Sequence, residues 1–149
     1  MKKKRELAES INRQARFNYA LEKNFVAGIK LSGSEVKSIK EGLVSFVDSY
    51  CIFDAGELFL KSLHITPLKY TRGHEATADR KLLLTKNELK KLEAELKTGY
   101  TVVPLRVFEN DKGLIKVEIS LAKGKKQYDK RESIKNKDIE RQTKRDLSN

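Results

Sequence analysis

The clearest hydrophobic pattern is an alternation of apolar and polar residues near the end of the apolar-rich part of the chain. In residues 114–121 (LIKVEISL), Ile115, Val117 and Ile119 alternate with polar residues, which predicts a strand with one buried and one open face. Residues 100–108 (YTVVPLRVF) precede it, and a polar, glycine-containing turn joins the two into a predicted hairpin. Further strands are expected at 17–31, 44–53 and 58–65, with residues 80–84 as a short strand or the lead-in to a helix.

Two short helices interrupt this strand pattern. The first is expected from about residue 33 to 41, where Ser32 or Ser34 can cap it and Gly42 ends it. The second begins at Thr85, because Thr85 and Glu88 have the spacing of a capping box. Its apolar stripe consists of Leu89, Leu92 and Leu96, and Gly99 stops it.

Two residues inside the predicted strands suggest irregular pairing. Gly28 permits a bend or bulge in the strand 17–31, and Pro104 belongs at a bulge or an edge. Five or six mostly antiparallel strands with two short helices predict a mainly β fold. We expect a small antiparallel barrel of the oligonucleotide-binding (OB) type, with a small sandwich as the alternative.

The two ends of the chain differ from its middle in charge. The protein has 149 residues and a formal net charge of +11. Most of the excess lies in residues 1–16 and 123–149, which flank a nearly neutral middle, and the last segment has few apolar residues. We therefore expect a basic N-terminal arm (1–16), a barrel (17–122) and a basic tail (123–149) that is disordered when free and orders on an anionic partner. This layout indicates nucleic acid, above all RNA.

Other function classes find little support. No apolar run approaches the ~20 residues of a membrane span, and the tail lacks the apolar face of a membrane-surface helix, which leaves membrane binding a weak alternative. The single cysteine, Cys51, reads as a buried residue of a protein in the reducing cytoplasm. A Cys51–His64 nucleophilic pair is the weak alternative, with His64 as an ordinary strand residue the better interpretation. His64 and His74 do not make a metal site, and we expect no metal, no cofactor and no enzymatic activity.

Six stretches, taken in order along nearly the whole chain, resemble small protein B, the tmRNA-binding (SsrA-binding) family of bacterial ribosome rescue. They are 27–29 (AGI), 33–38 (GSEVKS), 48–50 (DSY), 65–67 (ITP), 80–84 (RKLLL) and 124–131 (GKKQYDKR). The resemblance implies an OB barrel that holds the tRNA-like domain of tmRNA. It also implies delivery to stalled ribosomes with elongation factor Tu–GTP, by a protein that we expect to be a monomer. The tail would probe the decoding centre and the empty mRNA channel, where it would become helical.

The resemblance also implies a set of tmRNA-binding residues. They are Gly33, Ser34, Glu35, Lys37, Leu83, Lys116 and Lys125. Small residues at 33 and 34 would allow close approach of RNA, and Lys37 lies one turn further on. Leu83 has a competing interpretation as a core residue, whereas Lys116 points away from the apolar face of its strand.

The tail residues assigned to the ribosome by the same resemblance are Lys126, Tyr128, Asp129, Lys130 and Arg131. The basic side chains suit ribosomal RNA phosphates. Tyr128 would stack on an unpaired base or fold back on the barrel. Asp129 would fix Lys130 or Arg131, or accept a hydrogen bond from a base edge.

The chain departs from the family pattern at Val26, where many relatives carry an acidic residue associated with tmRNA recognition. Glu22 and Glu35 are the candidates to supply that acid. A generic ribosomal-RNA or single-strand-binding OB protein remains the alternative function, and it would be expected to show several aromatic residues on an exposed strand face.

Overall fold

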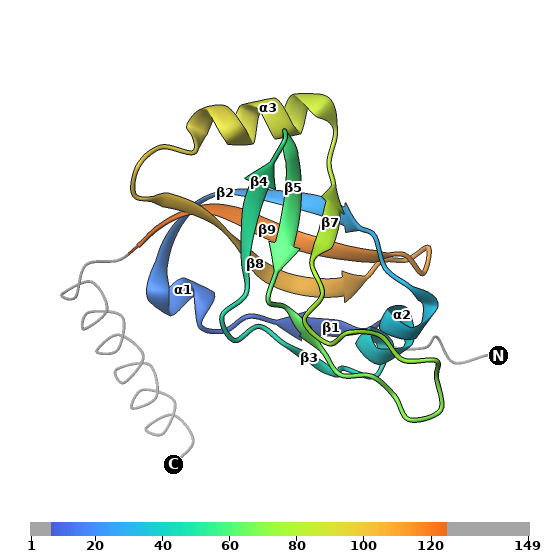
Figure 1. Ribbon diagram of the computed structural model, residues 1–149. Helices are drawn as coiled ribbons and strands as arrows, with labels where there is room; N and C mark the ends of the chain where they lie inside the picture. The colour runs from blue at the N-terminus through green and yellow to red at the C-terminus, as the bar shows by residue number, and fades with distance from the viewer. Residues whose placement is uncertain (1–6, 125–149) are drawn as a thin grey trace, which may run out of the picture.

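The computed structural model describes residues 7–124, in which an antiparallel sheet curls into a barrel (Figure 1). Its strand order is β1-β8-β4-β5-β7-β2-β9, and β9 also pairs with β8, which closes the barrel. The strands of this sheet are β1 (Glu9–Ile11), β2 (Tyr19–Ile29), β4 (Tyr50–Asp54), β5 (Glu57–Lys61), β7 (Arg80–Leu83), β8 (Tyr100–Glu109) and β9 (Ile115–Gly124). Strands β3 (Val44–Ser45) and β6 (His64–Ile65) form a separate pair. The mainly β, OB-type prediction is confirmed.

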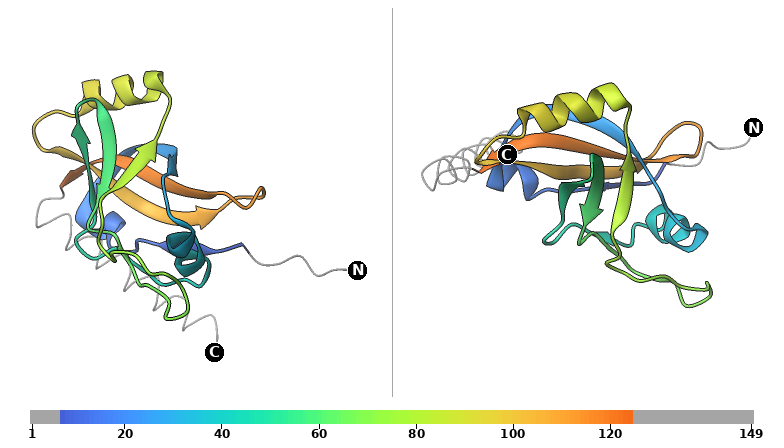
Figure 2. Two further views of the ribbon diagram at one scale, coloured as in Figure 1. Left: turned by 45° about the vertical axis from the view of Figure 1, so that its right-hand side comes forward. Right: turned by 45° about the horizontal axis from the view of Figure 1, so that its top comes forward.

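The helices are α1 (Ala15–Asn18), α2 (Gly33–Lys40) and α3 (Lys86–Glu95). Helix α3 lies across one end of the barrel, and α2 lies toward the other end beside the loop of residues 66–79 (Figures 1 and 2). Inward side chains of the strands, among them Leu58, Leu60 and Val117, are fully buried, and α3 adds Leu92 to the same core. Burial of this apolar surface is the main stabilising contribution to the barrel.

Both longer helices begin as their sequences predict. Ser32 caps α2 and accepts a hydrogen bond from the backbone N–H of Glu35, whose carboxylate accepts one from the backbone N–H of Ser32. Thr85 and Glu88 make the same reciprocal pair at α3. Each capping box satisfies two backbone N–H groups that have no partner within the helix.

Two predicted strands are each broken in two. Asp48 and Ser62 both have φ of 62°, in the left-handed region. After β3 the chain turns, because the backbone N–H and the Oγ of Ser49 donate to the carbonyl of Phe46 at 2.9 and 2.6 Å. The strands expected at 44–53 and 58–65 therefore become β3 with β4 and β5 with β6.

The irregular positions are partly as expected. The register of β8 with β9 shifts between Pro104 and Arg106, which confirms the bulge near Pro104. The shift between β2 and β9 lies between Leu21 and Lys23 rather than at Gly28. Strand β1 pairs with β8 and so extends the sheet into the segment that the sequence assigned to the N-terminal arm.

Candidate nucleic-acid interface

Three neighbouring strands place Leu83, Gly28 and Lys116 in one row across the outside of the barrel. Gly28 on β2 pairs with Leu83 on β7 and with Lys116 on β9. Directly paired residues of antiparallel strands share a face of the sheet. Leu83 is 51% exposed, so its interpretation as a core residue is wrong. Two of the predicted tmRNA-binding residues, the exposed Leu83 and the half-buried Lys116, thus flank Gly28 on the outside of the barrel.

Gly28 is constrained by its neighbour in this row. A Cβ atom at this position would lie 3.3 Å from the Cβ of Leu83, closer than an ordinary van der Waals contact. The glycine leaves bare backbone between Leu83 and Lys116. The Cδ1 of Leu83 would also lie 3.6 Å from such an atom, so the glycine makes room for the side chain of Leu83 in this row.

The adjacent row of the same face carries an acid. Val26, which is 51% exposed, pairs with Glu118, and Glu118 pairs with Arg106 on β8. The Nε of Arg106 donates to Oε2 of Glu118 at 3.1 Å, and the guanidinium lies 4.0 Å from the centroid of the Phe108 ring. A carboxylate therefore lies one strand away from Val26.

Glu118 is a third acid to consider for the missing acidic position, beside the two residues suggested by the sequence. Glu22 accepts a hydrogen bond from the hydroxyl of Tyr100 at 3.2 Å, as Glu118 does from Arg106, and Glu35 is buried. Sequence reasoning missed Glu118 because the pairing of Val26 with Glu118 depends on the register between β2 and β9. The alternation in 114–121 did indicate that Glu118 points away from the core.

The residues of α2 that were predicted to bind tmRNA differ in their exposure. Gly33 and Lys37 are exposed, and a Cβ built on Gly33 would have no atom within 4 Å. No atom of residues 7–124 requires a glycine there, and with respect to this part of the chain the space above Gly33 is open. Lys37 lies one turn further along the same helix and supplies a cation.

Ser34 instead faces the loop of residues 66–79. Its Oγ lies 2.7 Å from Nδ1 of His74 and 3.1 Å from Oγ1 of Thr71. Nε2 of His74 lies 2.8 Å from the carbonyl oxygen of Ile65, to which it donates. These hydrogen bonds attach the loop to the first turn of α2, so Ser34 holds the loop in place.

Glu35 forms a buried ion pair with Arg80. The guanidinium of Arg80 also donates to the carbonyl oxygens of Leu63 at 2.6 Å and of Ala76 at 3.0 Å. Burial raises the pKa of Glu35, but the hydrogen bond from Ser32 and the charge of Arg80 outweigh it and lower the pKa overall. Direct contact between this carboxylate and RNA does not fit its burial, so Glu35 positions α2 rather than facing a ligand.

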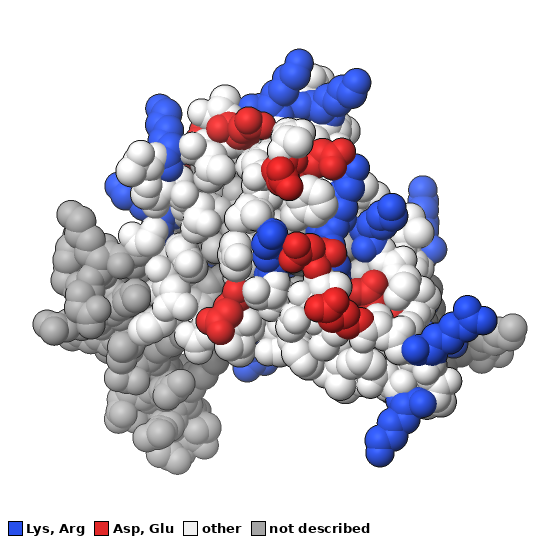
Figure 3. Space-filling model, viewed as in Figure 1, with Lys and Arg blue, Asp and Glu red and all other residues white. Residues whose placement is uncertain are grey.

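Basic and acidic side chains are distributed differently over the face seen in Figure 3. Lys and Arg side chains project near α3 and near the end with α2 and the loop, and acidic side chains lie between these two ends and also close to α3. Among the described residues, Glu57 forms an ion pair with Lys81 at 2.8 Å and Asp79 forms one with Lys61 at 3.2 Å.

Comparison with known proteins identifies the family. The family model described as SmpB protein matches residues 9–149. The chain belongs to the SmpB family. It is 52% identical over 133 residues to the SsrA-binding protein of Bacteroides thetaiotaomicron, covering 87% of this chain and 89% of that one. It is 49% identical over 139 residues to the SsrA-binding protein of Acholeplasma laidlawii, covering 91% and 93%.

A solved structure agrees with this assignment. A chain of the structure described as "tmRNA-SmpB: a journey to the center of the bacterial ribosome" matches with a TM-score of 0.69 and 40% identity, covering 80% of this chain and 86% of that chain. SmpB family membership confirms the prediction of an RNA-binding protein that is not an enzyme.

The structure gives no support to a nucleophilic cysteine, a metal site or a membrane-spanning helix in the described part of this SmpB protein. Cys51 is buried, and burial raises the pKa of its thiol, which opposes formation of the nucleophilic thiolate. Within residues 7–124 there is no group of three or more His, Cys, Asp or Glu that could hold a metal ion. Over the same range, no helix is both long enough and apolar enough to cross a bilayer.

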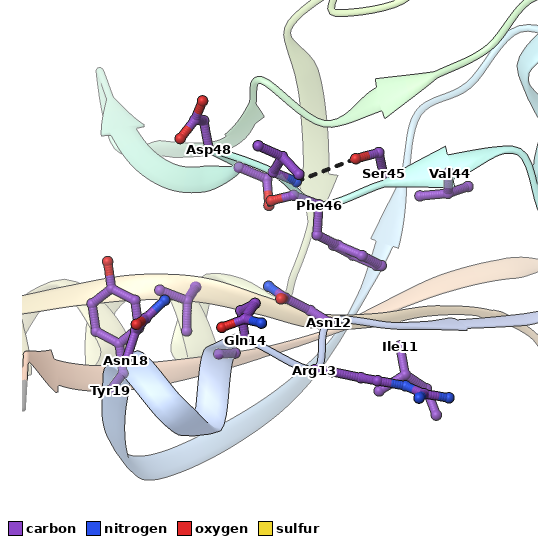
Figure 4. Close-up of a pocket in the computed structure, with 14 residues that line it drawn as sticks. Ile11, Asn12, Arg13, Gln14, Asn18, Tyr19, Val44, Ser45, Phe46 and Asp48 are labelled. Carbon is purple, nitrogen blue, oxygen red and sulfur yellow. Dashed lines mark hydrogen bonds between the residues drawn. The ribbon is translucent and has the colours of Figure 1, made fainter. Parts of the chain in front are cut away.

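The tail residues assigned to the ribosome, and Lys125, lie outside the described residues. The last described residue, Gly124, pairs with Tyr19 at the start of β2. Tyr19 also lines a groove of about 590 Å³, whose walls carry Arg13 and Asn18 on one side and Asp48 on the other (Figure 4). The last described residue therefore lies next to a residue of this groove, whose lining mixes polar side chains with apolar ones such as Val44 and Phe46.

Proposed function

We propose that this SmpB protein binds the tRNA-like domain of tmRNA and delivers it to stalled bacterial ribosomes for trans-translation. The observation that carries the proposal is the row of Leu83, Gly28 and Lys116 on the outside of the barrel, which gathers residues from three strands into one contact face with Leu83 exposed. Lys116 supplies a cation for phosphate. The names of the relatives and of the matching solved structure support the choice of tmRNA and the ribosome as partners.

The contact extends from this row to its neighbours on the barrel and on α2. Glu118 takes the place of the acid expected at Val26, one strand away. Gly33 and Lys37 add backbone approach and charge, and Lys125 adds a further cation. Ser34 and Glu35 act indirectly, because Ser34 binds the loop and Glu35 binds Arg80.

The tail completes the function on the ribosome. Lys126, Lys130 and Arg131 bind ribosomal RNA phosphates in the decoding centre and the empty mRNA channel, and Tyr128 stacks on an unpaired base. Asp129 orients its basic neighbours or accepts a base-edge hydrogen bond. The protein acts as a monomer in the cytoplasm, within a delivery complex that contains elongation factor Tu–GTP.

A reconstituted translation system tests delivery. Ribosomes stalled on an mRNA without a stop codon should add the tmRNA-encoded tag to the nascent chain only when this protein is present. Tagging at the same rate in its absence would contradict the proposal.

The alternative, a generic single-strand-binding barrel, has less support. The exposed aromatic residues within 7–124 are Tyr50 on β4 and Tyr70 in a distant loop, and these two do not form a stacking platform on one face of the sheet.

A further inference from the structure

The loop between β6 and β7 presents an exposed aromatic ring among basic side chains. Tyr70 is 71% exposed, and Lys69 and Arg72 on either side of it are exposed as well. Thr71 closes the turn, since its backbone N–H and its hydroxyl both donate to the carbonyl of Leu68, at 3.2 and 2.9 Å. A tyrosine this exposed contributes little to the core, so its position needs another explanation.

Tyr70 is held in place although it is exposed. Its hydroxyl donates to Oε1 of Glu41, at the end of α2, at 2.7 Å. The contacts of Ser34 with Thr71 and His74 fix the same loop to the beginning of α2. A ring whose orientation is already restricted loses less conformational entropy when a ligand binds to it.

The charge around the ring suits an anionic ligand. Lys37 on α2 adds an exposed cation to Lys69 and Arg72. Glu41, the acid that accepts from the Tyr70 hydroxyl, keeps its negative charge, and the three cations outnumber it. An aromatic ring with flanking cations is the usual combination for an unpaired nucleotide, because the ring stacks on the base and the cations meet the phosphates. Lys37 also continues this surface into the proposed tmRNA contact.

We propose that Tyr70 is a stacking platform for an unpaired base of the bound RNA, with Lys69 and Arg72 contacting the adjacent phosphates. This inference rests on the proposed function and extends it to a second RNA contact, at the end of the barrel that carries α2. The chemistry is that of a single-stranded RNA segment, which both tmRNA and ribosomal RNA contain.

Substitutions at Tyr70 separate a stacked ring from other contacts. Binding of the full-length protein is measured in two arms, one with the tRNA-like domain of tmRNA and one with ribosomes. Tyr70→Ala should weaken binding about 5- to 150-fold in at least one arm, which also tells the source of the base. Tyr70→Phe keeps the ring without the hydroxyl and should stay within about twofold of the unsubstituted protein, whereas Tyr70→Leu should resemble alanine.

Three results would overturn the stacking role. The first is a Tyr70→Ala variant whose affinity is unchanged in both arms. The second is a Tyr70→Phe variant that binds as weakly as Tyr70→Ala, which would assign the contact to the hydroxyl. The third is a Tyr70→Leu variant that binds as tightly as Tyr70→Phe, which would indicate an apolar contact such as a protein partner makes. If the unsubstituted protein binds tmRNA no better than an ordinary tRNA, the proposed function fails first. If the protein does prefer tmRNA over an ordinary tRNA but Tyr70→Ala binds as tightly as the unsubstituted protein in both arms, only the stacking role of Tyr70 fails.

The salt dependence of binding tests the flanking cations. In the arm affected by Tyr70→Ala, Lys69→Gln should reduce the slope of log affinity against log salt by about 0.7, as for the loss of one single-strand phosphate contact. Lys86→Gln is the matched control, an exposed lysine on α3 at the other end of the barrel, and should leave the slope unchanged. Equal slopes for Lys69→Gln and Lys86→Gln would remove Lys69 from the contact.

Discussion

Leu83 and its neighbour Leu82 show how two adjacent leucines divide between core and surface. Leu82 is 2% exposed, whereas Leu83 is 51% exposed, because successive side chains of a strand point to opposite faces. The sequence RKLLL does not show which leucine faces inward. The pairing of Leu83 with Gly28 decides it.

The division between the two leucines predicts opposite effects of truncation. Leu82→Ala should lower the free energy of unfolding by about 2–5 kcal/mol, whereas Leu83→Ala should change it by less than about 0.5 kcal/mol. Leu83→Ala should instead weaken binding of the tRNA-like domain. Urea unfolding and gel-shift titration measure the two effects, and a large loss of stability in Leu83→Ala would contradict its place in the interface.

The ion pair of Glu35 with Arg80 predicts a dependence of stability on pH. The pKa of Glu35 is lowered in the folded protein, so its contribution is complete above its unfolded-state pKa of about 4.3 and is lost as pH falls through the lower folded-state value. Glu35→Gln should reduce the free energy of unfolding at neutral pH by about 3–5 kcal/mol, because Arg80 stays buried without its partner. The difference between the two proteins should shrink below pH 4. An equal difference at pH 7 and pH 3 would show that the carboxylate charge is not the cause.

For single residues, the sequence predicted whether a side chain points outward more reliably than it predicted what the side chain contacts. The outward direction of Lys116 follows from alternation in its strand. The burial of Glu35 did not follow, because its partner Arg80 lies 45 positions away in the sequence. The same limit hid Glu118, which meets Val26 only through the register of β2 with β9.

At the scale of elements, α2 and α3 are alike in capping and different in position. Each begins with a capping box, and each lies toward one end of the barrel. Helix α2 carries Gly33 and Lys37 of the proposed tmRNA contact, whereas α3 carries none of the proposed contacts. The two helices therefore provide an internal comparison between stability and binding.

Removing each N-cap tests that comparison. Ser32→Ala and Thr85→Ala should each lower the free energy of unfolding by about 1 kcal/mol. Only Ser32→Ala should also weaken binding of the tRNA-like domain, since it loosens the first turn of α2. Thermal unfolding and gel shifts of both variants measure the effects. Equal weakening of binding in the two variants would mean that stability, and not the position of α2, controls binding.

Elements with strong local signals were predicted well. The two capping boxes, Gly42 after α2 and the hairpin of β8 with β9 all depend on nearby residues. The breaks at Asp48 and Ser62 were missed, because apolar residues continue on both sides of each break. The β3–β6 pair and β1 were missed as well, because two- and three-residue strands are stabilised by distant partners.

At the scale of the molecule, the barrel holds its proposed RNA contacts apart from the start of the tail. The row of Leu83, Gly28 and Lys116 crosses β7, β2 and β9, whereas the tail starts where Gly124 pairs with Tyr19 beside the groove. The barrel class could be predicted from strand number and length. The strand partners that close it could not, because β4 pairs with β8 and β2 pairs with β7 and β9, and these strands lie far apart in the sequence.

This separation predicts what truncation after Gly124 will do. The described part of the barrel loses no residue, so the truncated protein should fold and should keep most of its affinity for the tRNA-like domain, less the contribution of Lys125. Tagging on stalled ribosomes should be abolished, because the basic residues proposed for the decoding centre are gone. Circular dichroism, gel shifts and a reconstituted tagging assay measure these three properties, and full-rate tagging would refute the role of the tail.

Selective RNA binding is the central claim, and a gel-shift titration tests it most directly. The protein is titrated at near-physiological salt against tmRNA, its isolated tRNA-like domain and an ordinary tRNA. We expect tmRNA and its domain to bind at least about ten times more tightly than tRNA, a difference of about 1.4 kcal/mol. Equal, salt-sensitive binding to all three RNAs would contradict the account and leave a basic barrel without a particular RNA partner.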